Sequence, residues 1–171
     1  PIMLMSSDLP VLKAAIVIAK ERKPLLYPAT KENFAQIGAL AKEFQLPLVV
    51  VAQDIDALAQ LTKELNAIGV TELILDTGEK PIADKIWDLT QLRRQALKKS
   101  NRALGYPSLV IVDKTDLYEE AMEATACIAK YAGIVLISGM QTWQVLAILT
   151  LRQNIYTDPQ KPLQIEPNSI L

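Results

Sequence analysis

The sequence predicts an α/β fold in which five strand–helix units build a parallel sheet. Five short apolar runs, rich in Val, Ile and Leu, begin at Pro24, Pro47, Glu72, Ser108 and Gly133. Runs of this kind are typical of strands buried on both faces of a parallel sheet. Each interval between runs has room for one helix and two turns. Alternating strands and helices in turn favour parallel strands joined by right-handed crossovers.

Apolar residues at helical spacing fill these intervals and the stretch before the first run. Helices are expected at about 10–22, 34–44, 54–68, 81–100, 116–132 and 142–154. Asp54 and Asp116 are suitable N-caps for two of these helices. Gly69 and Gly133 are placed to end the helices that precede them.

Two closures of the predicted sheet stay open: part of an eight-stranded barrel, or an open doubly wound sheet. No glycine-rich phosphate loop follows any strand, which weakens the dinucleotide-binding version of the open sheet. We expect residues 1–155 to form one partial barrel domain of five strand–helix units and a leading helix. Residues 156–171 carry three prolines and no periodicity, so we interpret them as an exit linker of a longer polypeptide.

Composition excludes several classes of function. The formal net charge of −1 and the pI of about 5.6 give no overall attraction to nucleic acid or to an anionic membrane surface. Histidine is absent and Cys127 is the single cysteine, which excludes Ser–His and Cys–His nucleophiles and a cysteine-ligated cluster. The absence of a disulfide and of a signal peptide favours a cytoplasmic setting. The uncharged residues 131–151 are interpreted as a strand, a polar break and a buried helix, not as a membrane span.

A basic stretch precedes the fourth predicted strand. Within ten positions it contains Arg93, Arg94, Lys98, Lys99 and Arg102. Cations near the carboxyl end of a helix complement the helix dipole. No aromatic residue lies within the cluster, which argues against a nucleic-acid site. We interpret the stretch as a solvated helix face, with Asp84 and Asp88 on the same water-facing side. A phosphate-binding or partner-docking patch is the alternative.

Four segments together carry a resemblance to a known family. They are LLYPAT, LILDTGEKP, LRRQALKKSNRALGYPSLVIV and RQNIYTDPQKPLQIEPNSIL. In combination they resemble the large (gamma) subunit of the corrinoid iron–sulfur protein of the acetyl-CoA synthase/decarbonylase system, from end to end of this chain. The resemblance implies that the chain is the C-terminal five strand–helix units of a TIM barrel, followed by a linker toward a corrinoid-binding domain.

The resemblance also implies a function. In that family the protein accepts a methyl group from a methyl-folate or pterin methyltransferase and delivers it to acetyl-CoA synthase. The large subunit pairs with a small subunit and carries a corrinoid (cobalamin) and a [4Fe-4S] cluster. This chain lacks the four-cysteine motif and a corrinoid domain, so we expect neither cofactor to be ligated by this segment alone. No catalytic or metal-ligating residue is assigned to it.

A barrel in this role is expected to cover the corrinoid with the carboxyl ends of its strands. The candidate cofactor-binding residues there are Thr30, Asp76, Thr77, Gly78, Asp113, Ser138, Gly139 and Met140. Asp76 and Asp113 end two strands at equivalent places. For Thr30, Asp54 and Thr115 helix capping is the competing interpretation, and for residues 138–140 a tight turn.

Two further functions remain as alternatives. A pterin-binding methyltransferase barrel would use Asp76 and Asp113 to hold the pterin ring. An open-sheet regulatory domain would need an acidic cluster at the first strand, where this chain has LLYPAT. The carrier interpretation predicts unpaired sheet edges at Pro24–Pro28 and Ile134–Ile137, and therefore an association-prone chain.

Overall fold

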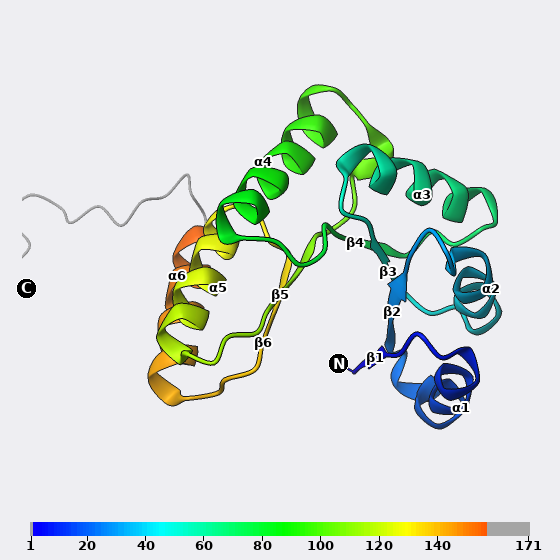
Figure 1. The fold of residues 1–171 in the computed structure, drawn as a ribbon, viewed down its shortest axis with the longest axis horizontal. Helices are drawn as coiled ribbons and strands as arrows, with labels where there is room; N and C mark the ends of the chain where they lie inside the picture. The colour runs from blue at the N-terminus through cyan, green and yellow to red at the C-terminus, as the bar shows by residue number, and fades with distance from the viewer. Residues whose placement is uncertain (1, 157–171) are drawn as a thin grey trace, which may run out of the picture.

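The computed structural model describes residues 2 to 156 as six parallel strands with helices between them (Figure 1). The strands are β1 (Met3–Met5), β2 (Leu25–Ala29), β3 (Leu48–Val51), β4 (Leu73–Asp76), β5 (Leu109–Val112) and β6 (Ile134–Ile137). The helices are α1 (Leu9–Ala19), α2 (Phe34–Phe44), α3 (Ile55–Ala67), α4 (Ile82–Lys98), α5 (Leu117–Ala129) and α6 (Thr142–Tyr156), with short 3-10 helices η1 (Lys20–Arg22) and η2 (Arg102–Leu104). The predicted alternation of strands and helices is therefore confirmed.

The strands lie side by side in the order in which they occur along the chain. One sheet has the order β1-β2-β3-β4 and a second has β5-β6, with every pair parallel. Between the two sheets the ladder is reduced to a single bridge that joins Leu75 and Ser108. A doubly wound sheet reverses its strand order at a switch point, and this chain does not. Sequential order instead matches consecutive strands of a barrel.

The prediction of five strands was incomplete, because the described chain opens with a sixth. Strand β1 has three residues and pairs with β2 through Met3–Leu25, Leu4–Leu26 and Met5–Tyr27. A Met-Leu-Met segment is too short to show the apolar run of a buried strand. The predicted edge at Pro24–Pro28 is consequently wrong, since β1 covers it. The edge at Ile134–Ile137 is confirmed.

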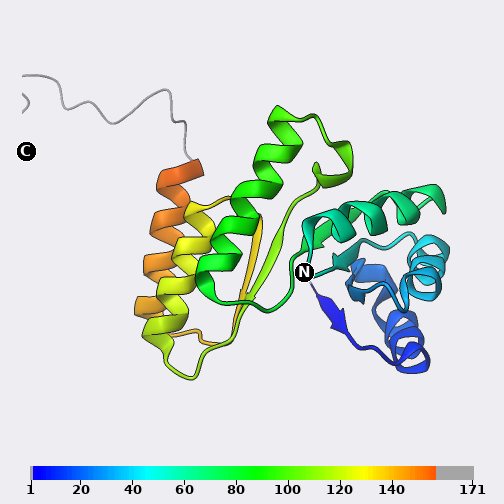
Figure 2. The same ribbon diagram turned by 45° about the horizontal axis from the view of Figure 1, so that its top comes forward.

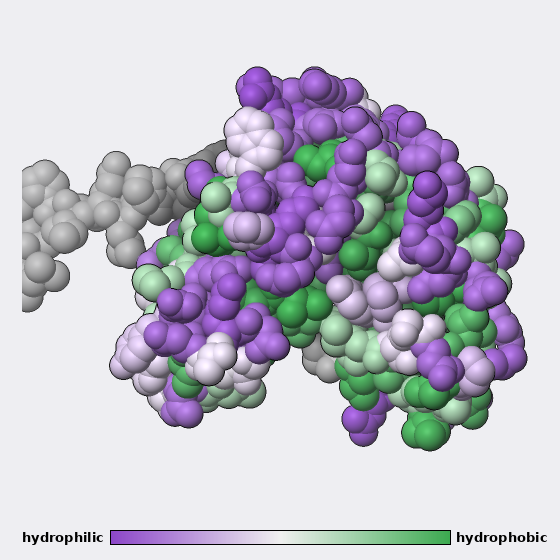
Figure 3. Space-filling view, in the orientation of Figure 1, coloured by the Kyte–Doolittle hydropathy of each residue, from purple (hydrophilic) through white to green (hydrophobic). Residues whose placement is uncertain are grey.

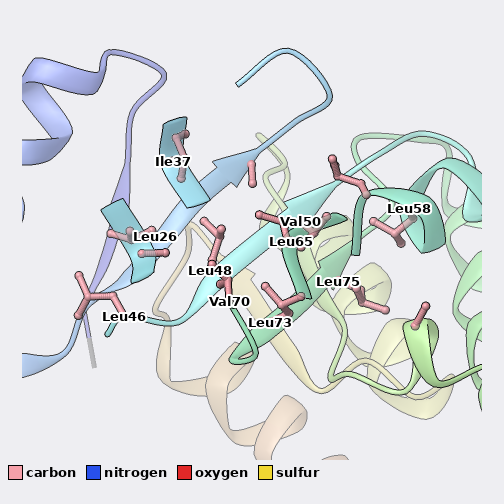
Figure 4. Close-up of a cluster of buried hydrophobic side chains, with 14 of the residues drawn as sticks. Leu26, Ile37, Leu46, Leu48, Val50, Leu58, Leu65, Val70, Leu73 and Leu75 are labelled. Atoms are coloured by element: carbon pink, nitrogen blue, oxygen red, sulfur yellow. The ribbon is translucent and has the colours of Figure 1, made fainter. Parts of the chain in front are cut away.

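The main hydrophobic core lies between the four-stranded sheet and helices α1, α2 and α3 (Figure 4). Leu48 and Val50 of β3, and Leu73 and Leu75 of β4, point to the same face of the sheet as Leu26 of β2. There they meet helix residues that are fully buried, namely Leu12, Ile16, Ile37, Leu58 and Leu65. All three helices therefore cover one face, which is the arrangement of a barrel and not of a doubly wound sheet.

Some helix ends follow the predicted capping pattern and others do not. The side chains of Asp54 and Asp116 cap α3 and α5, and Gly69 takes a left-handed conformation with φ of 95° after α3. The proposed Thr30 and Thr115 caps are wrong, because Asn33 and Asp116 occupy the N-cap positions. Gly133 does not end α5 either. Tyr131 takes the left-handed position there, with φ of 79°.

The water-facing side of α4 was partly mispredicted. Asp84 is exposed, but Asp88 is buried, and so is the neighbouring Lys85. Both form ion pairs, Asp88 with Lys80 and Lys85 with Glu123. The basic residues Arg93, Arg94, Lys98, Lys99 and Arg102 are exposed, as expected for a solvated helix end.

Helix α6 packs beside α5 but is not the buried helix that its sequence predicted (Figure 2). Gln144 and Ile148 are buried, whereas Leu146 and Leu149 are 64% and 53% exposed. Helix α6 therefore exposes apolar as well as polar side chains to solvent. Within residues 2–156, no helix is long and apolar enough to cross a membrane.

Candidate functional site

The loops that follow β2 to β6 lie at one end of the sheet, because all the strands are parallel. We call these loops the carboxyl rim; they comprise residues 30–33, 52–54, 77–81, 113–116 and 138–141. Most of the candidate residues belong to them. The side chains of the carboxyl rim are tied together by three groups of polar contacts, centred on Asp76, Lys85 and Glu120.

Asp76 ends strand β4 and is 4% exposed. Its Oδ1 accepts a hydrogen bond from the Gly78 backbone N–H at 2.8 Å, and its Oδ2 accepts one from the Tyr27 hydroxyl at 3.2 Å. Burial raises the pKa of Asp76 above its usual range, and these hydrogen bonds offset only part of the rise. Burial and the Asp76 carboxylate likewise raise the pKa of the Tyr27 hydroxyl. Tyr27 thus connects β2 to the end of β4.

Gly78 gives the turn after β4 its shape. Its φ of 77° is in the left-handed region, and a Cβ at this position would lie 2.7 Å from Nε2 of Gln53. Thr77 beside it is buried. The turn is therefore close-packed against the loop after β3, and larger residues at position 78 would disturb both loops.

Lys85 of α4 is the centre of the second group, with 2% of its side chain exposed. Its ammonium donates hydrogen bonds to Glu123 of α5 at 2.8 Å, to Glu79 at 3.1 Å and to the backbone carbonyl of Ile111 at 3.2 Å. The Glu123 carboxylate also pairs with Lys114 at 3.2 Å. These contacts join α4, β5 and α5 where the strand ladder between β4 and β5 is reduced.

The charges of this group stabilise one another. Burial alone lowers the pKa of Lys85, but the hydrogen bonds and charges of Glu123 and Glu79 outweigh it and raise that pKa. Burial likewise works to raise the pKa of Glu123, and the two lysines hold that pKa below its usual range. Beside them, Lys80 pairs with Asp88 and donates to the backbone carbonyl of Gln53. The resulting fixed charges tie the loop after β4 to its neighbours.

Glu120 of α5 organises the third group, and its side chain is fully buried. Its Oε1 accepts from the backbone N–H and the hydroxyl of Ser138, at 2.7 Å and 2.6 Å, and its Oε2 accepts from the Gly139 N–H at 3.0 Å and from the Gln144 amide. Burial alone raises the pKa of Glu120, but these hydrogen bonds outweigh it and lower the pKa to about 2. The carboxylate is therefore ionised and anchors the turn after β6.

Gly139 fits closely beneath this carboxylate. A Cβ there would lie 2.8 Å from the Glu120 carboxylate and 2.5 Å from Oε1 of Gln144. That Gln144 oxygen is buried and has no hydrogen-bond partner among residues 2–156. The tight-turn interpretation of Ser138 and Gly139 has direct support from these contacts, whereas their contact with a ligand stays a prediction.

The predicted site residues are only partly brought together. Asp76, Thr77 and Gly78 form one largely buried turn, and the exposed Ser138 and the half-buried Gly139 form a second turn. The other candidates, Thr30, Asp113 and Met140, form no recorded hydrogen bond with either turn. The Thr30 hydroxyl donates to Glu32 at 2.6 Å. Asp113 is exposed, and Met140 is 83% exposed. Asp76 and Asp113 are therefore not equivalent.

Sequence reasoning missed Lys85, Glu120 and Glu123, three buried charged residues around which two of the three groups of contacts form. A signal existed, because each falls on the apolar stripe of its helix. Lys85 is spaced by four and seven positions from the buried Leu89 and Leu92, and Glu120 by four and eight from the buried Ala124 and Ile128. A charged residue at a buried helical position indicates a fixed ionic partner elsewhere in the fold.

The carboxyl rim has the chemistry of a fixed polar scaffold. The buried charges beside it already have partners: Lys85 pairs with Glu123, whereas Asp76 and Glu120 accept hydrogen bonds from neighbouring N–H and hydroxyl groups. No group of three His, Cys, Asp or Glu side chains within the described chain could hold a metal ion. Such an arrangement holds the loops in fixed positions.

Comparison with known proteins places this scaffold in a family. Residues 1–170 match the family model described as CO dehydrogenase/acetyl-CoA synthase delta subunit. The chain belongs to this family. It is 39% identical over 165 residues to the corrinoid/iron-sulfur protein large subunit of Moorella thermoacetica, covering 96% of this chain and 37% of that protein. It is 32% identical over 180 residues to the acetyl-CoA decarbonylase/synthase complex subunit gamma of Methanothermobacter thermautotrophicus, covering 98% of this chain and 39% of that protein.

These relatives confirm the resemblance to the large or gamma subunit. The family description says delta, whereas both relatives are named large or gamma. The chain spans well under half of the length of each of these curated relatives.

Solved structures of low sequence identity support the fold alone. The 7,8-dihydropteroate synthase from Vibrio fischeri superposes with a TM-score of 0.68 at 17% identity, over 92% of this chain and 68% of that chain. A second dihydropteroate synthetase, solved with a product, gives a TM-score of 0.60 at 17% identity, over 90% of this chain and 70% of that chain. The strands of this chain are therefore consecutive strands of a partial TIM barrel.

Proposed function

We propose that this chain is the barrel portion of a corrinoid iron–sulfur methyl-carrier subunit. In this proposal the complete subunit accepts a methyl group from a methyl-folate or pterin methyltransferase and delivers it to acetyl-CoA synthase. The observation that carries the proposal is the 39% identity to a corrinoid/iron-sulfur protein large subunit over 96% of this chain. The proposed partners are the small subunit, the methyltransferase, acetyl-CoA synthase and the rest of its own subunit, in the cytoplasm.

The barrel's part in this function is to cover the corrinoid with its carboxyl rim. The rim offers an apolar contact at Met140, which is 83% exposed, and polar contacts at the exposed Asp113 and Ser138. The turns at Asp76–Gly78 and Ser138–Gly139 keep these residues in place through hydrogen bonds with Tyr27 and Glu120. Covering a reactive cofactor and excluding water needs pre-organised loops and no protein base.

The residues of this chain do not fit as ligands of either cofactor. A [4Fe-4S] cluster needs four cysteine thiolates, and the chain has one cysteine, which is fully buried. Burial raises the pKa of the Cys127 thiol to about 11, so it stays protonated. The chain has no histidine to bind cobalt. Any cofactor ligands therefore belong to other parts of the subunit.

The alternative function is a pterin-binding methyltransferase barrel. One observation favours it: Asp76 is a buried carboxylate with a raised pKa at the end of a barrel strand. Such a group suits the hydrogen-bond donors of a pterin ring. Asp113, the second residue of that hypothesis, is exposed. Binding of methyl-folate to the chain in the absence of corrinoid, abolished by Asp76→Ala, would support this alternative over the carrier.

The carrier proposal is tested by methyl transfer in the complete subunit. Met140→Glu places a charge on the carboxyl rim, and we expect it to slow methyl transfer by about tenfold or more, because a displaced docking surface misaligns the reacting groups. Corrinoid content should not change. The matched control is Met122→Glu on the outer face of α5, at a side chain that is 64% exposed. Equal transfer rates for both variants would contradict the role of the carboxyl rim.

A further inference from the structure

A groove lies at the opposite end of the barrel from the carboxyl rim, beside the basic stretch. It is a cavity of about 370 Å³. Its walls include Leu89, Leu92, Ala96 and Leu97 of α4, Tyr106 before β5, and Tyr131 before β6. Ser108 and Gly133, which precede β5 and β6, also line it, so the groove is at the amino ends of these strands. We call it the basal groove.

The basal groove has both apolar and polar walls, and Arg93 of the basic stretch lines it. Leu97, in the wall of the groove, is 65% exposed and so offers an apolar contact beside the cations. No acidic residue occurs between positions 89 and 112. The same segment contains five exposed cations: Arg93, Arg94, Lys98, Lys99 and Arg102. None of these five forms an ion pair within residues 2–156. Figure 3 shows a largely hydrophilic surface over α4 and the turn after it.

Tyr131 forms one wall of the groove at a cost in backbone energy. It follows α5 in the left-handed conformation, with φ of 79°, where glycine or asparagine is the usual residue. A bulky residue is strained there, and the loss is of the order of 1–2 kcal/mol. The ring lies under the guanidinium of Arg93, 4.9 Å from its Cζ, and 46% of the residue is exposed. Glycine would adopt this conformation without strain, so the turn alone does not account for an aromatic residue at position 131.

We propose that the basal groove docks an acidic amphipathic helix of a partner protein. The apolar face of such a helix would cover Leu97 and the ring of Tyr131. Its carboxylates would pair with the cations of the basic stretch, which form no ion pair within the described residues. The inference does not rest on the proposed function, because it concerns the other end of the barrel.

Nucleic acid fits these observations less well. The groove has an apolar floor of leucines, and one face of Tyr131 is already covered by Arg93. The whole chain carries a net charge of −1, which gives no long-range attraction for a polyanion. An acidic helix needs only the local cations.

The test uses the 171-residue chain and a fluorescein-labelled synthetic helix of 18 residues, with leucines at i, i+3, i+4 and i+7 spacing and glutamates elsewhere. A peptide of identical composition in shuffled order is its control. We expect the amphipathic peptide to bind at least tenfold more tightly in fluorescence anisotropy. The affinity should fall as salt rises, because the pairs are exposed to solvent.

Three variants locate the binding. The double variant Arg93→Glu, Arg94→Glu should lower the affinity for the peptide by tenfold or more. The control is the double variant Lys13→Glu, Lys20→Glu, which should leave the affinity unchanged. It alters two exposed cations, one on α1 and one on η1. Tyr131→Gly should weaken binding about fivefold. Its melting temperature should equal or exceed that of the parent, because glycine relieves the left-handed strain.

Each contrary result overturns the proposal. Equal binding of the shuffled peptide would mean simple charge attraction. Tighter binding of a uridine 20-mer than of the amphipathic peptide would mean a nucleic-acid site. A Tyr131→Gly variant that melts earlier and binds the peptide unchanged would mean that the ring serves the fold alone. No binding by the parent chain would remove the docking site altogether.

Discussion

The two halves of this partial barrel are held together by different forces. The half built on β1–β4 has one continuous core of apolar side chains from the sheet and three helices. The half built on β5 and β6 has two small clusters, one around Val110 and Cys127 and the other around Ala124 and Ile148. In this second half the charged groups around Lys85 and Glu120 occupy the space where apolar residues would otherwise pack.

This difference teaches how one fold can be stabilised in two ways. Apolar burial is non-directional and insensitive to pH, whereas buried charges depend on each partner and on protonation. The two regions can also be followed separately, because both tryptophans, Trp87 and Trp143, belong to α4 and α6. Tryptophan fluorescence therefore reports α6 in the second half and α4 at the junction of the two halves, and far-ultraviolet circular dichroism reports the whole chain.

The largest expected effect concerns the outer edges of the two halves. Strands β1 and β6 have no neighbour on one side within residues 2–156, so we expect the chain to self-associate. Sedimentation velocity should show species well above the 18.9 kDa of a monomer. Met5→Lys, on the β1 edge, should reduce association, since an edge lysine disfavours strand pairing. Met122→Lys on α5 is the control, and a monomeric parent chain would contradict the prediction.

The next effect breaks the charged group of the second half. Lys85→Met leaves Glu123 buried with only Lys114, and loss of one partner of a buried pair costs about 3–5 kcal/mol. The pKa of Lys85 is raised in the folded chain. Its contribution to the free energy of unfolding is therefore complete at a pH below the pKa of the unfolded chain, and it is lost as the pH rises through the pKa of the folded chain. The urea midpoint by fluorescence should fall at pH 7. Lys98→Met, at an exposed position, should leave it unchanged.

A cavity in the first half should have an effect of similar or slightly smaller size. Leu65 is fully buried, and Leu65→Ala should cost about 2–5 kcal/mol. Circular dichroism should record the earlier loss of structure, while tryptophan fluorescence should shift less. Leu146→Ala, at a side chain that is 64% exposed, is the control. If both probes shift equally, the halves unfold as one unit and the comparison between them fails.

Glu120 should make the second half acid-sensitive. Glu120→Gln presents an amide to a site of hydrogen-bond donors and should cost about 2 kcal/mol at pH 7. The pKa of Glu120 is lowered to about 2 in the folded chain. Its contribution to the free energy of unfolding is therefore complete at a pH above its pKa in the unfolded chain, and it is lost as the pH falls toward 2. The difference between variant and parent in fluorescence melts should shrink over that range. A constant difference from pH 7 to pH 2 would be evidence against this network.

Asp76 should behave in the opposite way and have the smallest effect. Its pKa is raised in the folded chain, so ionisation disfavours folding as pH rises through that value. Asp76→Asn keeps an acceptor for Gly78, and we expect a gain of no more than about 1 kcal/mol at pH 7. The gain should vanish near pH 3 in dichroism melts. A clear loss of stability would show that the ionised carboxylate is needed by the first half.

Much of the fold could be predicted from local patterns. All five apolar runs are strands, and the predicted helices lie where the 3.6-residue spacing put them. The short β1 could not be predicted, because three residues carry no periodicity and the strand exists only by pairing with β2. The candidate residues follow the carboxyl ends of the strands as expected, yet the buried charges beside them were missed.

The sequence by itself determined the parallel α/β order and the family resemblance, because these follow from local periodicity and short motifs. Only the tertiary structure decided which charges are buried. Lys85 meets Glu123 across 38 positions, and Glu120 meets Ser138 across 18. A charge is stable inside a protein only where folding brings its partner to it, and no local pattern specifies that distance.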